Sequence, residues 1–265
     1  MLGYHVILRL DDDRVIAPSR AERRRIARKL AEMSRKMHIL CWKLADTHLH
    51  IVVLGKERPD ELIRRLKIWF ANAVRPGVPL EVQRNKPIRS QSHLESVFHY
   101  ALSQDSHHGS EIDTWQDASS VVDTLGLRVL CPEIATRVSE HHPRLKRPSL
   151  LEHLGVEELD EGVHIEVLAD AAMGAFGLDA LTLRGDGARA RRAAVAAVGG
   201  AARTADIARA LGVEAAAVRR LATEGASARE MRAVRLQMAL RVARPAVAEF
   251  VRECLAPTYG QVGAQ

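Results

Sequence analysis

The amino-acid composition changes sharply near residue 140, and this change limits what the chain can fold into. Seven of the ten aromatic residues precede residue 140, the last lysine is Lys146, and alanine rises from 10 in the first 140 residues to 29 in the last 105. Alanine has the highest intrinsic helix propensity, and a chain of 265 residues has room for one or two domains. We therefore predict a first domain at residues 1–137, a proline-containing linker at 138–150 and an all-α domain at 151–265.

The first domain alternates strand-like and helix-like segments. Apolar and β-branched runs predict strands at 4–10, 37–44, 48–54 and 78–82, and apolar residues at three- and four-residue spacing predict helices at 19–36, 59–73 and 92–104. Ser19 with Glu22, and Ser92 with Glu95, have the spacing of a helix-capping box. The order βαββαβα folds most simply as a ferredoxin-like, split βαβ antiparallel sheet with its helices on one face. The expected fold class is α+β, with an all-α domain after the sheet.

A pair of histidines stands at the start of the third expected strand. Side chains alternate between the two faces of a strand, so His48 and His50 project the same way and can chelate one cation. The apolar run 51–54 that follows is typical of a central strand, which would hold the pair rigidly. The spacing alone is equally compatible with a polar pair on an edge strand.

The third expected helix carries Tyr100 and Gln104, which share a face at a spacing of four residues. Tyrosine can act as a nucleophile, and the glutamine amide can supply a neutral oxygen ligand to a metal ion. A tyrosine on a helix is usually a core or surface residue. Its combination with the histidine pair about 50 residues earlier is the more informative pattern.

Three pieces of the chain, GYHVILR, HLHIVVL and YALSQ, resemble the single-tyrosine HUH transposases, in which U is a hydrophobic residue, and among them the REP-associated tyrosine transposases. The resemblance covers about residues 1 to 130 and places His48, Leu49 and His50 at the HUH positions. It departs from the family at Thr47, where an asparagine is familiar, and after Gln104, where the Asn-Pro of one branch is absent.

The resemblance implies a metal-dependent reaction on single-stranded DNA, at hairpin-bearing ends. Mg²⁺ or Mn²⁺ would be held by His48, His50 and Gln104, and Tyr100 would attack a phosphodiester to form a 5′-phosphotyrosine link. The released 3′-hydroxyl, or that of another strand, would reverse the step and rejoin DNA. Asp46, His99, His107 and His108 are further candidates for proton transfer, although turn, loop or packing roles are favoured for each.

Charge is distributed in three blocks. Residues 1–150 carry 25 basic and 18 acidic side chains (+7), residues 151–183 carry no basic and 8 acidic ones (−8), and residues 184–252 carry 14 and 6 (+8). Basic side chains on the first and third blocks are candidate phosphate contacts, with an ordinary solvated face as the alternative. The candidates are Arg23, Arg25, Lys29, Arg64, Lys67, Arg89, Arg219 and Arg220. We hypothesise that the acidic block docks on one of the basic faces when DNA is absent.

The segment 204–221 has the spacing of a helix-turn-helix, with Thr204 as a cap, Gly212 at the turn and apolar residues facing inward on both helices. With the upstream GARARRAAVAAVG it resembles the C-terminal DNA-binding domain of the replication initiator DnaA. That domain's histidine-containing signature is replaced by the run from Glu214 to Ala217. The resemblance implies contact with duplex DNA, and an alanine-rich helical hairpin is the alternative.

Several classes of protein are disfavoured by the sequence. Three separated cysteines encode neither a disulfide framework nor a zinc ribbon, and no run reaches the roughly 18 apolar residues of a membrane span. We expect a cytoplasmic monomer or homodimer without a membrane partner. A non-catalytic DNA-binding regulator of the same fold is the alternative function. A histidine-triad phosphoesterase is weaker, because Val52 stands where a third histidine is needed.

Overall fold

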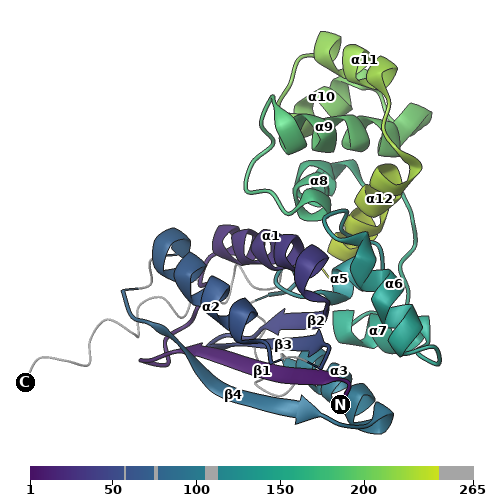
Figure 1. The fold of residues 1–265 in the computed structure, drawn as a ribbon. Coiled ribbons are helices and arrows are strands. Elements are labelled where there is room, and N and C mark those ends of the chain that lie inside the picture. Colours follow the sequence, from purple (N-terminus) through teal and green to yellow (C-terminus); the bar gives the residue numbers. More distant parts are fainter. Residues whose placement is uncertain (57, 75–76, 105–112, 245–265) are drawn as a thin grey trace, which may run out of the picture.

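The computed structural model describes residues 1–56, 58–74, 77–104 and 113–244 and has an α+β fold. One four-stranded antiparallel sheet has the order β2-β3-β1-β4 (Figure 1). The strands are β1 (Gly3–Leu10), β2 (Ile39–Leu44), β3 (His48–Leu54) and β4 (Leu80–Ile88). The first helices are α1 (Arg20–Met37), α2 (Asp60–Trp69) and α3 (Gln91–Leu102). β3 therefore separates the parallel strands β1 and β2, and β1 separates the parallel strands β3 and β4.

Local sequence signals explain where α1 and the β2–β3 hairpin begin and end. Ser19 and Glu22 form the reciprocal hydrogen bonds of a capping box, as predicted, and α1 ends at His38 in a left-handed conformation with φ 45°. The backbone N–H of Ala45 then donates to His48 O at 2.9 Å and closes the tight turn between β2 and β3. This turn places His48 at the first position of β3.

The two faces of the sheet are covered by different helices. Tyr4, Val6 and Leu8 of β1 lie on the face that packs with the apolar residues of α1 and α2, whereas α3 lies across the opposite face (Figure 1). The prediction that the helices share one face is therefore correct for α1 and α2 and wrong for α3. The face that α3 covers therefore carries the side chains of β1 and β3 that alternate with those facing α1 and α2.

Three predicted elements have different limits in the structure. The strand β4 runs on to Ile88 because it is an edge strand, where polar side chains and Pro87 are tolerated. The helix α2 ends at Trp69 and continues as the π-helical turn η1 (Phe70–Val74). The cap of α3 is Ser90, whose side chain accepts from His93 N, rather than Ser92.

The segment predicted as a linker is packed and partly helical. It begins at the end of α6 (Pro132–His141), crosses a short connection at 142–146 and ends in α7 (Arg147–Leu154), and a short α5 (Val121–Thr124) precedes these helices. Val138, Leu150 and Leu151 are buried in the same core as the sheet. Apolar contact with the first domain therefore keeps this segment packed in spite of its two prolines. One of them stands in the first turn of α7, where proline is compatible with a helix.

The remaining described residues form a second, alanine-rich core. Its elements are η2 (Ile165–Val167), α8 (Leu168–Phe176), α9 (Gly185–Val198), η3 (Gly199–Ala201), α10 (Thr204–Leu211), α11 (Ala215–Glu224) and α12 (Ala228–Ala243). The small side chains of Ala171, Ala190 and Ala194 are fully buried there, so these helices approach one another closely. Between α10 and α11 the chain turns at Gly212, whose φ of 61° favours glycine.

The two cores are joined by α12 and by ion pairs. Leu236 and Leu240 of α12 belong to the first core, while Val234 and Met238 belong to the second. Asp170, from the acidic block, lies 2.6 Å from Arg20, 3.0 Å from Arg24 and 2.5 Å from Arg241. Asp170 of the acidic block thus contacts basic side chains of the first domain, and the dependence of this docking on DNA stays a prediction. Within the described residues, no helix is long and apolar enough to cross a membrane.

Candidate functional site

His48 and His50 lie side by side on the α3 face of β3. Their ring centroids are 4.9 Å apart, and the antiparallel register pairs them with Arg9 and Ile7 of β1. His50 is fully buried, whereas His48, at the end of the strand, is partly exposed. The alternation of strand side chains therefore places both histidines on one face of β3. His50 lies inside the fold and His48 lies at its surface.

Tyr100 projects from α3 toward this pair. Its ring centroid lies 5.6 Å from that of His50, with the rings nearly perpendicular, and 42% of the residue is exposed to solvent. α3 packs on β2 and β3 through the buried side chains of Leu94, Val97 and Ala101, which set its rotation. A tyrosine of this kind is fixed at its backbone, close to two imidazoles, and open to a substrate from solution.

His5 is a third imidazole of the site that the sequence analysis missed. Its Nε2 lies 3.1 Å from His50 Nδ1, and its ring centroid is 6.0 Å from that of Tyr100. Burial, together with the charges of Arg84 and His93, lowers the pKa of His5 to about 4, so the ring is neutral at pH 7. In the antiparallel register His5 is diagonal to His50, and only knowledge of that register could have identified it.

Gln104 is near Tyr100 but not on the same helix. α3 ends at Leu102, and the side-chain Nε2 of Gln104, which is 1% exposed, donates back to Tyr100 O at 2.5 Å. The predicted helix therefore ends two residues before Gln104, and the two residues are joined by this side-chain-to-backbone hydrogen bond. The approach of Gln104 Oε1 to the histidine pair stays a prediction.

The donor set fits a divalent metal ion. Two imidazoles and one amide oxygen are ligands that Mn²⁺ accepts, and the softer imidazoles favour Mn²⁺ over Mg²⁺. Among the described residues, no group of three or more His, Cys, Asp and Glu gathers as a candidate metal site. A metal here would thus depend on Gln104 as its third protein ligand.

A buried positive charge adjoins the site. Lys43 is the register partner of His50 on β2 and is completely buried, with its Nζ 2.6 Å from Gln116 Oε1 and 3.5 Å from Asp113 Oδ2. Lys43 thus lies on the same face of the sheet as His50, and its buried ammonium is paired with the carboxylate of Asp113.

The other proton-transfer candidates are placed differently. His99 contacts α7 rather than the Tyr100 site, with its Nδ1 3.0 Å from His153 Nε2, in keeping with the packing role favoured for it. Asp46 lies in the β2–β3 turn, where its carbonyl accepts from Ile16 N. His107 and His108 lie outside the described residues.

The predicted phosphate contacts divide into buried and exposed side chains. Arg23 is 4% exposed and donates to Ala17 O and Pro18 O, so it does not lie on a surface that DNA could reach. The others lie wholly or partly at the surface: Arg25, Lys29, Arg64, Lys67, Arg89, Arg219 and Arg220. Arg64 and Lys67 are paired with Glu61 and Glu81, which reduces the charge they offer.

The chain matches no protein-family model, no curated protein and no solved structure.

Proposed function

We propose that the protein cleaves and rejoins single-stranded DNA as an HUH-type, single-tyrosine transposase. The observation that carries this proposal is the gathering of His48, His50 and Tyr100, from a central strand and the helix that covers it. The strand order β2-β3-β1-β4 supports it as well, because it is the order of a ferredoxin-like, split βαβ sheet. The histidine pair and the tyrosine come from separate segments that the sequence analysis linked by their resemblance to this family.

In the proposed reaction Tyr100 Oη attacks the phosphorus atom of a phosphodiester. A new Oη–P bond forms, the P–O3′ bond breaks, the phenol proton passes to solvent, and the leaving 3′-oxygen takes up a proton to give a 3′-hydroxyl. A bound Mn²⁺ or Mg²⁺ would polarise a non-bridging oxygen and stabilise charge in the transition state. His5 Nε2 lies 3.1 Å from His50 Nδ1, and this contact would orient the His50 ring for holding the metal. The phosphotyrosine conserves the energy of the broken bond, so a 3′-hydroxyl can reverse the step.

The C-terminal helices support contact with duplex DNA. A short turn at Gly212 joins α10 to α11, and this succession of two helices supports the proposal of a helix-turn-helix. Arg219 and Arg220 are exposed on α11. This observation also favours the second candidate function, a DNA-binding regulator that keeps the fold without cleaving DNA.

A covalent-adduct assay tests the proposal. The protein is incubated with single-stranded hairpin DNAs, including the sequences that flank its own gene, in the presence of Mn²⁺. Wild type and the control Tyr4→Phe, which alters a core tyrosine, should form a protein–DNA band, whereas Tyr100→Phe should form none. Equal adduct from Tyr100→Phe, or none from wild type across the library, contradicts cleavage by Tyr100. DNA binding without adduct would favour the regulator.

A further inference from the structure

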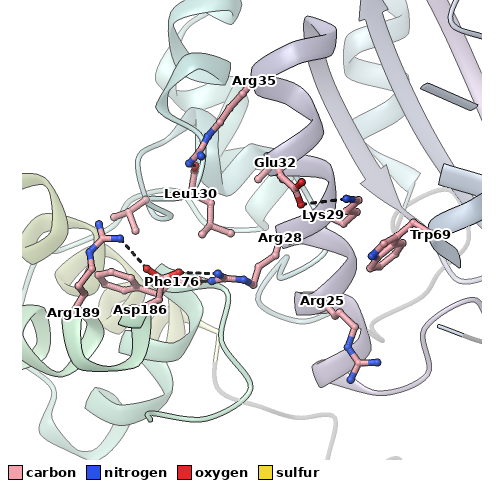
Figure 2. Close-up of a pocket in the computed structure, with 12 residues that line it drawn as sticks. Arg25, Arg28, Lys29, Glu32, Arg35, Trp69, Leu130, Phe176, Asp186 and Arg189 are labelled. Carbon is pink, nitrogen blue, oxygen red and sulfur yellow. Dashed lines mark hydrogen bonds and ion pairs between the residues drawn. The ribbon is translucent and has the colours of Figure 1, made fainter. Parts of the chain in front are cut away.

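A basic hollow lies where the two cores meet, away from the histidine pair. Its volume is about 490 Å³, and its walls come from α1, the end of α2, the segment 129–130, α8 and α9 (Figure 2). Five of the lining side chains are cationic and two are acidic. The cationic ones are Arg25, Arg28, Lys29, Arg35 and Arg189. Because α1 covers the sheet face opposite α3, this hollow is separate from the Tyr100 site (Figure 1).

The α1 side of the hollow is a stripe along the helix rather than a single point. Arg25, Arg28, Lys29 and Arg35 recur at spacings that place them on one face of α1. Ten residues from Arg25 to Arg35, at about 1.5 Å per residue, span about 15 Å. The stripe therefore offers positive charge along a length of backbone rather than at one phosphate.

The carboxylate of Asp186, a residue of the protein itself, lies in the hollow. Asp186 accepts from Arg28 Nη2 at 2.7 Å and from Arg189 Nη1 at 2.8 Å, as the dashed lines in Figure 2 show. The hydrogen bond from Arg28 leads the effects that lower the pKa of Asp186, so this group is a carboxylate at neutral pH. Arg28 is further fixed by donating to Phe176 O at 2.7 Å. Two guanidinium groups are thus held in place around an oxyanion.

Two other arginines that line the hollow can offer their positive charge to a ligand. Arg25 and Arg35 are exposed and donate to backbone carbonyls, those of Ala73 at 3.4 Å and Leu130 at 2.9 Å. In the described part of the chain, neither makes an ion pair with a carboxylate. Trp69 lines the same hollow and is half-buried, which leaves part of its indole accessible for stacking.

We propose that this hollow binds the phosphate backbone of single-stranded DNA, with a base stacked on Trp69. Arginines along α1 supply the phosphate contacts, and the indole accounts for preferring a single strand, whose bases are free to stack. The choice of DNA among polyanions rests on the proposed function. Binding at the hollow does not require Tyr100 or a metal.

The test measures fluorescence anisotropy of a labelled single-stranded thymidine oligonucleotide, in EDTA, over a range of salt concentrations. The pocket variant combines Arg25→Gln and Arg35→Gln, neither of which joins the two cores through an ion pair in the described structure. The control combines Arg58→Gln and Arg203→Gln, which remove the same charge from side chains exposed by 70% and 86% outside the hollow. We expect about tenfold weaker binding and a shallower salt slope for the pocket variant alone.

Asp186→Asn adds an opposite expectation, because it removes a competing carboxylate while keeping an oxygen acceptor, and it should tighten binding severalfold. Equal affinities for the pocket and control variants would overturn the proposal, as would unchanged affinity in Asp186→Asn. Stronger binding of an equally long duplex would overturn the single-strand assignment. Since the assay contains no metal, binding at the hollow together with absence of adduct contradicts the cleavage proposal alone.

Discussion

At the scale of single residues, the site depends on a contact between strands that the sequence does not reveal. His48, His50 and Tyr100 were identifiable because each lies in a local pattern, an alternating strand or a helix turn. His5 was not, because its closeness to His50 depends on the register of β1 against β3. Arg23 shows the converse, since its place in a run of basic residues predicted a surface position, yet it is buried on backbone carbonyls.

His5→Phe should weaken the use of metal while leaving the fold intact. The substitution keeps an aromatic ring but removes the 3.1 Å contact that orients His50. Loss of a partner that orients a metal-binding histidine typically costs about 10- to 100-fold in metal affinity or activity. We expect the Mn²⁺ concentration for half-maximal adduct formation to rise by about that factor, with a thermal unfolding midpoint close to wild type. The control is His164→Phe, at a partly exposed histidine that precedes η2; an unchanged Mn²⁺ requirement in His5→Phe would refute the orienting role.

At the scale of elements, local signals predicted helix starts and the hairpin, and tertiary contacts decided the rest. The capping box of Ser19 and the limits of β3 follow from neighbouring residues. The helices α6 and α7 replace the expected linker because Val138 and Leu150 are buried against distant segments. The charge blocks likewise do not predict that Asp170 of α8 is the carboxylate shared by α1 and α12.

Asp170→Asn should destabilise the protein in a pH-dependent way. Burial alone would raise the pKa of Asp170, but the charges of Arg241, Arg20 and Arg24 outweigh it and lower the pKa to about 2. A carboxyl whose pKa is lowered on folding contributes stability above its unfolded pKa, near 4, and loses it as pH falls through 2. We expect the variant to be about 2 kcal/mol less stable than wild type at pH 7, a difference that shrinks between pH 4 and 2.

Urea titrations across that pH range measure the difference in the free energy of unfolding between Asp170→Asn and wild type. Asp179→Asn, at an exposed acid of the same block, is the matched control and should stay close to wild type at every pH. A deficit in Asp170→Asn that is constant from pH 7 down to pH 2 would show that the carboxylate charge is not what stabilises the junction.

At the scale of the whole molecule, the two cores share a helix in spite of the change in composition that divides the chain. Leu236 and Leu240, near the end of the described chain, fill the core of the sheet domain. Trp115 also ties the parts together, because its Nε1 donates to Arg244 O at 3.0 Å and the guanidinium of Arg20 lies 4.0 Å from its ring. The composition does not predict the helix that the two cores share.

Leu240→Ala should therefore destabilise both parts together. Truncating a fully buried leucine lowers the free energy of unfolding by about 2 to 5 kcal/mol. Leu240 lies in the core that also contains Trp42, and other residues of its helix α12 lie in the alanine-rich core. All three tryptophans precede residue 140, so their fluorescence reports on the first core, whereas far-UV circular dichroism reports on the helices of both. We expect the two signals to shift by the same amount in thermal or urea unfolding. Leu183→Ala, at a leucine that is 78% exposed, should leave both signals where they are in wild type. Separation of the fluorescence and dichroism transitions in Leu240→Ala would mean that the alanine-rich helices fold independently of the sheet.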